Sequence, residues 1–128
     1  AVGGCQAEVG TAAAMTAGAV TSILGGTAQQ IASALALSLK NVLGLVCDPV
    51  AGLVEVPCVK RNGIFAVQAL TAAELALGGI ESQIPADQVI DAMNAIGRAL
   101  PEALRETSTG GLAVTPRARE IAQDLSDQ

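Results

Sequence analysis

Apolar positions recur along this chain at the spacing of amphipathic helices, and glycine or proline interrupts the pattern between segments. The breaks at Gly25-Gly26 and Gly78-Gly79, and prolines near helix starts, set the expected boundaries. Val50–Val54 could be extended, but one short segment makes no sheet. The pattern therefore predicts an all-α fold, a compact bundle of about five or six helices. The expected helical segments are residues 11–24, 27–43, 58–77, 85–100, 101–104 and 115–125.

The segment after Gly26 carries the strongest local signal. Thr27 is followed three residues later by Gln30, the spacing of a capping box. The helix that follows is apolar around most of its circumference. We therefore expect it near the centre of the bundle, with Leu35 and Leu39 buried.

A second feature is the connection between residues 47 and 58. Pro49 cannot continue a helix and favours an extended Asp48. Val50–Pro57 is apolar except for Glu55, whereas surface loops are normally polar. The composition predicts that this cysteine-bearing loop is buried.

Composition narrows the function classes. The 128 residues fit one domain, 1–128, and an opening without Met is read as part of a longer chain. Half of the residues are apolar (51%), with Phe65 the one aromatic, so closely packed helices are expected. The net charge is -5 and the basic residues are scattered, which argues against nucleic-acid binding. The most apolar stretch, Ile31–Val46, is too short and too polar to cross a membrane.

The three cysteines are the candidate functional residues. Cys5 lies 42 residues before Cys47, which lies 11 before Cys58, and neither zinc ribbons nor ferredoxins have this spacing. Each cysteine is expected at the end of an element rather than in an apolar stripe. Thiolates suit iron–sulfur clusters and zinc alike, and free cysteines are often simply buried. A zinc site would need Asp48 or Glu55 as fourth ligand, because the chain has no histidine.

The contexts of these cysteines resemble a known family, the iron–sulfur-dependent L-serine dehydratases. Gly3–Gly10 is similar to their first cluster motif, and Cys47–Cys58, followed by Arg61-Asn62, to the segment holding their second and third ligands. Glu106–Ala113 resembles a further family segment. The likeness covers nearly the whole chain and indicates the C-terminal, cluster-binding part of the alpha chain.

The resemblance implies a cytoplasmic lyase of amino-acid metabolism and gluconeogenesis that converts L-serine to pyruvate and ammonia. It implies an oxygen-sensitive 4Fe–4S cluster ligated by Cys5, Cys47 and Cys58. Three ligands leave one iron open to act as a Lewis acid on the serine hydroxyl. The implied partners are L-serine and an upstream segment or beta chain, with a homo-oligomer as a further option.

No general base can be named in this chain, so the isolated chain is expected to be inactive. Glu8, Asp48 and Glu55 are either carboxylates near the cluster or solvated charges. Arg61 either binds the substrate carboxylate or lies on a helix surface. The alternative function is a non-catalytic helical module whose cysteines are buried or hold a structural metal.

Overall fold

A computed structural model describes residues 2–127, and in this range the chain forms helices and no β-strand. The predicted all-α class is confirmed, and the helix number lies in the expected range. The helices are α1 (Val9–Ile23), α2 (Ala28–Lys40), α3 (Cys58–Leu77), α4 (Ala86–Ala99) and α5 (Pro116–Ser126). Four short 3-10 turns join them: η1 (Cys5–Ala7), η2 (Val50–Gly52), η3 (Glu102–Leu104) and η4 (Gly111–Val114).

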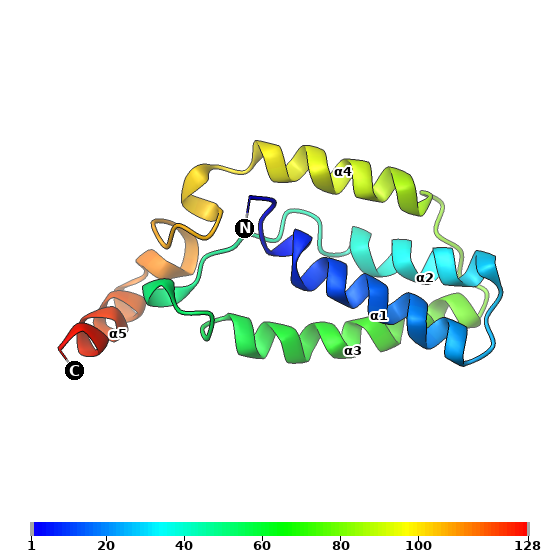
Figure 1. The fold of residues 1–128 in the computed structure, drawn as a ribbon, viewed down its shortest axis with the longest axis horizontal. Coiled ribbons are helices and arrows are strands. Elements are labelled where there is room, and N and C mark those ends of the chain that lie inside the picture. Colours follow the sequence, from blue (N-terminus) through cyan, green and yellow to red (C-terminus); the bar gives the residue numbers. More distant parts are fainter. Residues whose placement is uncertain (1, 128) are drawn as a thin grey trace.

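The helices form a bundle with one outlying arm. Helices α1, α2 and α3 pack against one another, and α4 lies along α2 (Figure 1). Helix α5 projects from one end, where it packs on η2 and η4. The N-termini of α1 and α3 lie at this same end, where Cys5 is in the turn before α1 and Cys58 begins α3.

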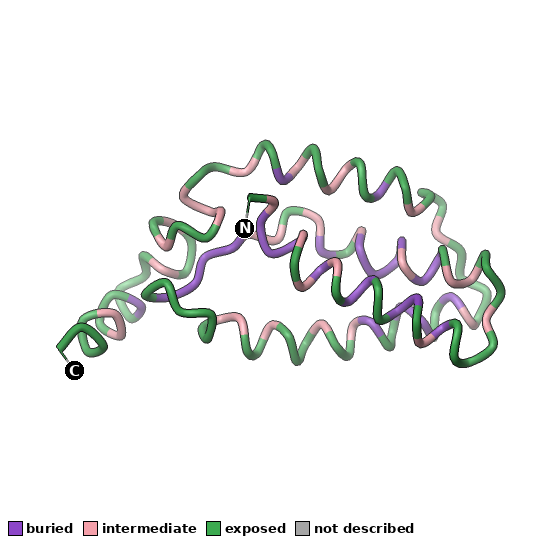
Figure 2. Tube along the Cα trace, in the orientation of Figure 1, coloured by how far each residue is buried: buried purple, intermediate pink, exposed green. Residues whose placement is uncertain are grey.

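Small side chains let the three central helices approach closely, as the composition predicted. Buried positions concentrate where α1, α2 and the C-terminal half of α3 face one another (Figure 2). Six of the seven residues in the main core cluster are alanines, and Phe65 packs against it. The members of this cluster are Ala13, Ala17, Ala34, Leu37, Ala69, Ala72 and Ala76.

Helix α2 is central, and its predicted capping box is present. The Thr27 hydroxyl accepts from the Gln30 amide at 3.2 Å, and the Gln30 side chain accepts from the Thr27 amide at 2.9 Å. The helix ends at Lys40 rather than continuing to residue 43. Leu39 is buried as predicted, but Leu35 is only partly buried, because it lies at the edge of the second core cluster.

The prediction of a buried loop at residues 50–57 is wrong for most of its length. Val50 is buried, but residues 51–56 are exposed, including Leu53 and Val54. The Val50 amide donates to the Val56 carbonyl at 2.9 Å, so the loop closes on itself and bulges away from the bundle. Helix α5 and η4 pack against the start of the loop at η2 but leave the side chains of Leu53 and Val54 exposed, which apolar composition alone could not show.

Among the described residues, no helix combines the length and apolar character that a membrane crossing requires.

Candidate metal centre

The cysteines lie at three element boundaries on one end of the bundle. Cys5 begins η1, Cys47 lies in the extended segment after α2, and Cys58 is the first residue of α3. Cys5 and Cys47 are buried, Cys58 is partly buried, and all three are free thiols. We call the three cysteines and the residues that hold them, Gln6, Asp48 and Arg61, the cysteine end.

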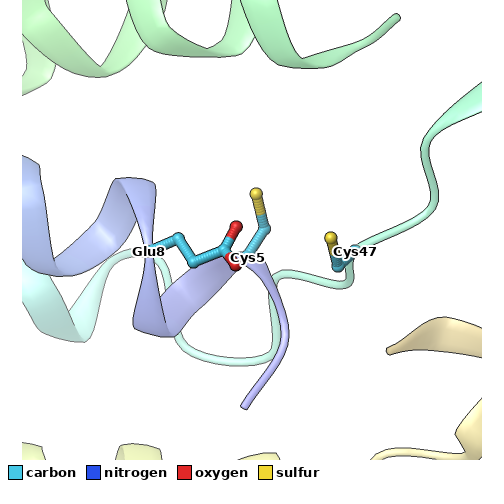
Figure 3. A group of neighbouring side chains, drawn as sticks. All are labelled: Cys5, Glu8 and Cys47. Atoms are coloured by element: carbon cyan, nitrogen blue, oxygen red, sulfur yellow. The ribbon is translucent and has the colours of Figure 1, made fainter. Parts of the chain in front are cut away.

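Two of the thiols and a carboxylate meet at this end. One ligand atom each from Cys5, Glu8 and Cys47 lies within 4.8 Å of the other two (Figure 3). The Cys5 and Glu8 side chains come from the turn that leads into α1, and Cys47 reaches the same space from the segment after α2. The fold thus brings together two sulfurs that are 42 residues apart in the sequence.

Cys58 lies outside this tight group but is electrostatically coupled to it. Burial raises the pKa of the Cys58 thiol, and the charge of Cys5 raises it further. The Arg61 guanidinium opposes this effect and lowers the same pKa. The third predicted ligand therefore interacts electrostatically with Cys5 without belonging to the three-residue group.

Gln6 fixes the turn that carries Cys5, a role that sequence reasoning missed. Its side chain is fully buried. The Gln6 Nε2 donates to the carbonyls of Gly3 and Met93 at 2.9 Å each, and Oε1 accepts from the Gly44 amide at 2.9 Å. One amide thus ties the N-terminal loop to α4 and to the turn after α2. The sequence offered one indication of this role, namely the position of Gln6 directly after Cys5 in the family-like motif.

The glycines before Cys5 permit close backbone packing. Gly4 has a φ of 74°, in the region that favours glycine. A Cβ at Gly4 would lie 2.7 Å from the Leu100 Cδ1 atom and 2.8 Å from the Leu45 carbonyl oxygen. Gly4 therefore allows the turn that carries Cys5 to pack closely against Leu45 and Leu100.

Asp48 and Arg61 form a largely buried ion pair near the cysteines. An Asp48 oxygen lies 3.4 Å from the Arg61 NH2, and both side chains are largely buried. Arg61 also donates to the Val46 carbonyl at 3.0 Å. Burial alone would lower the pKa of Arg61, but its hydrogen bonding and charge interactions with Cys5 and Asp48 raise it. Arg61 is thus engaged within the protein and is not a solvated helix-surface residue.

The segment after α4 is joined to the Cys47 segment by backbone pairing. The Cys47 amide donates to the Leu104 carbonyl at 2.9 Å, and the Glu106 amide donates to the Cys47 carbonyl at 2.8 Å. These bonds make an isolated parallel bridge between Cys47 and Arg105. The family-like segment at residues 106–113 therefore begins next to Cys47, beside the cysteine end.

Side chains add further hydrogen bonds between the segment after Cys47 and the C-terminal segment. The second Asp48 oxygen accepts from the Leu112 amide at 2.7 Å, and the Ser108 hydroxyl donates to the Pro49 carbonyl at 2.6 Å. A Cβ at Gly111 would lie 2.5 Å from the same Asp48 oxygen. Asp48 thus connects the segment after Cys47 to α3 and to the C-terminal segment, so it is neither solvated nor free to bind a metal.

The electrostatics of the site fit a bound cation. Burial raises the pKa of Cys47 to about 11, and the nearby negative charges of Cys5, Glu8 and Glu106 contribute to the shift. A metal bound among these groups would reverse it, because a coordinated thiol is held as the thiolate. In addition, the Arg105 Nε is the one buried side-chain N or O atom in residues 2–127 without a hydrogen-bond partner. This buried donor belongs to the residue whose backbone pairs with Cys47.

The other two carboxylates considered from the sequence, Glu8 and Glu55, differ in their distance from the thiols. Glu8 belongs to the group with Cys5 and Cys47, whereas Glu55 lies in the exposed loop and outside that group. Soft thiolates with one oxygen donor suit iron or zinc better than calcium or magnesium. The donor set is thus compatible with both the cluster and the single metal ion considered from the sequence.

Fold and site together define an all-α protein with a cysteine-lined candidate metal centre. The sequence profile of the family described as serine dehydratase alpha chain matches residues 1–113. The chain is 61% identical over 125 residues to a probable L-serine dehydratase alpha chain of Bacillus subtilis (strain 168), covering 98% of this chain and 42% of the relative. It therefore belongs to the serine dehydratase alpha chain family.

Two further relatives agree. The probable L-serine dehydratase alpha chain of Latilactobacillus sakei is 64% identical over 128 residues, covering 100% of this chain and 61% of the relative. The L-serine dehydratase alpha chain of Peptoniphilus asaccharolyticus is 50% identical over 123 residues, covering 96% of this chain and 42% of the relative. The chain thus spans between two fifths and three fifths of the length of these relatives.

Proposed function

We propose that this chain is the cluster-bearing part of an L-serine dehydratase, a lyase that converts L-serine to pyruvate and ammonia. Cys5, Cys47 and Cys58 would ligate a 4Fe–4S cluster. The observation that carries the proposal is the meeting of Cys5 and Cys47, from distant parts of the sequence, in a chain of the serine dehydratase alpha chain family.

The proposed reaction removes water from serine. The α-proton and the hydroxyl group leave to give an enamine, which becomes an imine, and hydrolysis of the imine yields pyruvate and ammonia. The cluster would supply a Lewis-acidic iron for the departing hydroxyl group. This chain would supply the three thiolates and their support by Gln6, Asp48 and Arg61. The base that takes the α-proton is not assigned to a residue of this chain, and we propose that another part of the enzyme supplies it.

The proposed partners are L-serine and an upstream segment or beta chain. The relatives are named alpha chains and are longer than this chain, and both facts support a further part of the enzyme. Exposed apolar side chains beside the cysteine end also support it, since Leu53 and Val54 on the loop and Val59 on α3 would be covered by such a part.

A structural metal site is the second candidate function. It is favoured by the compact group of Cys5, Glu8 and Cys47, whose ligand atoms lie close enough to share a single ion. In this case Cys58 would be a bystander, and the domain would hold one zinc ion without sulfide.

Metal analysis of the full-length enzyme, prepared anaerobically with its partner chain, separates the two functions. The proposal predicts bound iron and acid-labile sulfide in equal amounts and pyruvate formation from L-serine. Cys58→Ser is the sharpest variant, because it should abolish cluster uptake although Cys58 lies outside the tight group. Zinc without sulfide, or a C58S enzyme that retains the full cluster, would contradict the assignment. The isolated chain should form no pyruvate even after cluster reconstitution, because the proposed base lies in another part of the enzyme.

A further inference from the structure

Two acidic side chains lie beside the cysteines, and they are used differently. Asp48 is 3% exposed, and its two oxygens are occupied by Arg61 and by the Leu112 amide. Glu8 is exposed, yet one of its oxygens lies within 4.8 Å of both the Cys5 and Cys47 sulfurs. The first carboxylate is committed to holding the fold, whereas the second is directed at the metal-binding thiols.

Glu8 has no structural task that accounts for this placement. It is the residue before α1, but its side chain makes no capping hydrogen bond to that helix. Across residues 2–127, no hydrogen bond or ion pair of the Glu8 carboxylate is found, while Asp48 has both. Negative charge near a helix N-terminus is favourable, but that interaction does not require an approach to two thiols.

We propose that Glu8 is an exchangeable carboxylate ligand of the metal centre, occupying the iron that the three cysteines leave open. This inference rests on the proposed function. A carboxylate oxygen is a harder ligand than a thiolate and binds a thiolate-rich iron less firmly. The exposure and flexible side chain of Glu8 allow it to withdraw when the serine hydroxyl oxygen takes its place. Without substrate, Glu8 retains the fourth iron.

The test is the retention of that iron in the full-length, anaerobically reconstituted enzyme. Wild type, Glu8→Gln, Glu8→Asp and the matched control Glu55→Gln are each exposed to the same limited dose of oxidant without serine. Conversion to a three-iron cluster is followed by electron paramagnetic resonance, and the iron-to-sulfide ratio by chemical analysis. Neither readout depends on turnover.

E8Q should take up the cluster through its three cysteines but lose the fourth iron about tenfold faster than wild type, the scale on which groups around a metal affect its retention. E55Q should behave as wild type, and E8D should restore retention at least in part, because it keeps a carboxylate. If E8Q takes up no cluster, restoration of uptake by E8D supports the ligand role.

Equal iron loss in E8Q and wild type would overturn the proposal and leave the cluster assignment intact. An E8D enzyme as defective as E8Q would also overturn it, because the effect would then come from the shape of the turn and not from the carboxylate. A wild-type enzyme that binds no iron and sulfide would instead overturn the proposed function itself. The two failures are therefore distinguishable.

Discussion

The bundle core and the cysteine end are built by different interactions. In the core, alanines of α1, α2 and α3 contact one another, and the second core cluster is equally apolar. At the cysteine end, the side chains of Gln6, Asp48 and Arg61 bond mainly to backbone groups far away in the sequence. Close apolar packing holds the helices together, whereas directional hydrogen bonds hold the thiols in place.

This difference separates what fixes the fold from what fixes the site. An apolar core tolerates changes that conserve volume and loses stability in proportion to the volume removed. A buried polar network depends on each partner, because an unsatisfied buried group is costly. Variants in the core should therefore change stability mainly, while variants at the cysteine end should also change metal uptake.

The largest expected effect on stability comes from the core. Leu39 is 2% exposed in the second core cluster. Leu39→Ala should lower the free energy of unfolding by about 2–5 kcal/mol, the usual cost of truncating a buried leucine. Denaturant unfolding measures the loss, with Leu70→Ala on the exposed side of α3 as control. A loss within about 0.5 kcal/mol, as at a surface site, would show that this cluster does not carry the bundle.

Gln6→Ala should be the most damaging change among the polar residues. It removes three hydrogen bonds, so the Gly44 amide and the carbonyls of Gly3 and Met93 lose their Gln6 partner, and the tie between the N-terminal loop, α4 and the turn after α2 is broken. The expected loss is about 1–3 kcal/mol, accompanied by reduced iron uptake, because the Cys5 turn is released. Gln88→Ala on the exposed side of α4 is the matched control. Unchanged iron uptake in Q6A would show that Gln6 is not needed to position the metal-binding thiols.

Gly111→Ala isolates the contact between Asp48 and the C-terminal segment. Gly111 has a φ of 60°, and its added methyl group would meet the Asp48 carboxylate. Gly79→Ala is the matched control, because Gly79 has a φ of 88° but open space around it. Both changes share the backbone strain, so the additional loss in G111A reports the contact. We expect it to be about 1–2 kcal/mol, with faster proteolysis of the C-terminal segment. Equal losses would mean that Asp48 does not anchor that segment.

The bundle was predictable because its signals are local. The capping box at Thr27, the stop at Gly78-Gly79 and the opening at Thr115-Pro116 each depend on a few neighbouring residues, and each marks a boundary that the structure shares. The cysteine end was predictable only through family resemblance, because its contacts join residues up to 87 positions apart. No periodicity pairs Gln6 with Met93 or Asp48 with Leu112. The exposed loop after Val50 was predicted wrongly for the same reason.

The smallest expected effect is a pH dependence confined to the metal-free protein. Burial and neighbouring negative charge raise the pKa of Cys47 from its ordinary value of 9.0 to about 11. The native state therefore binds the proton more tightly than the unfolded state does. The full stability is present below pH about 9 and falls progressively as the pH rises towards about 11.

Between pH about 8 and about 10, the free energy of unfolding of the reduced, metal-free chain should fall by about 1 kcal/mol through Cys47. Cys47→Ala removes this titration but leaves the raised pKa of Cys58, which acts in the same direction. The difference between the two pH profiles therefore reports Cys47 alone. A bound metal should remove the Cys47 contribution too, because it holds the thiolate in the native state. If the stability of C47A changes with pH as steeply as that of wild type, ionisation of Cys47 does not destabilise the protein. The cysteine end would then differ from the core in its hydrogen bonds but not in the effect of its charges.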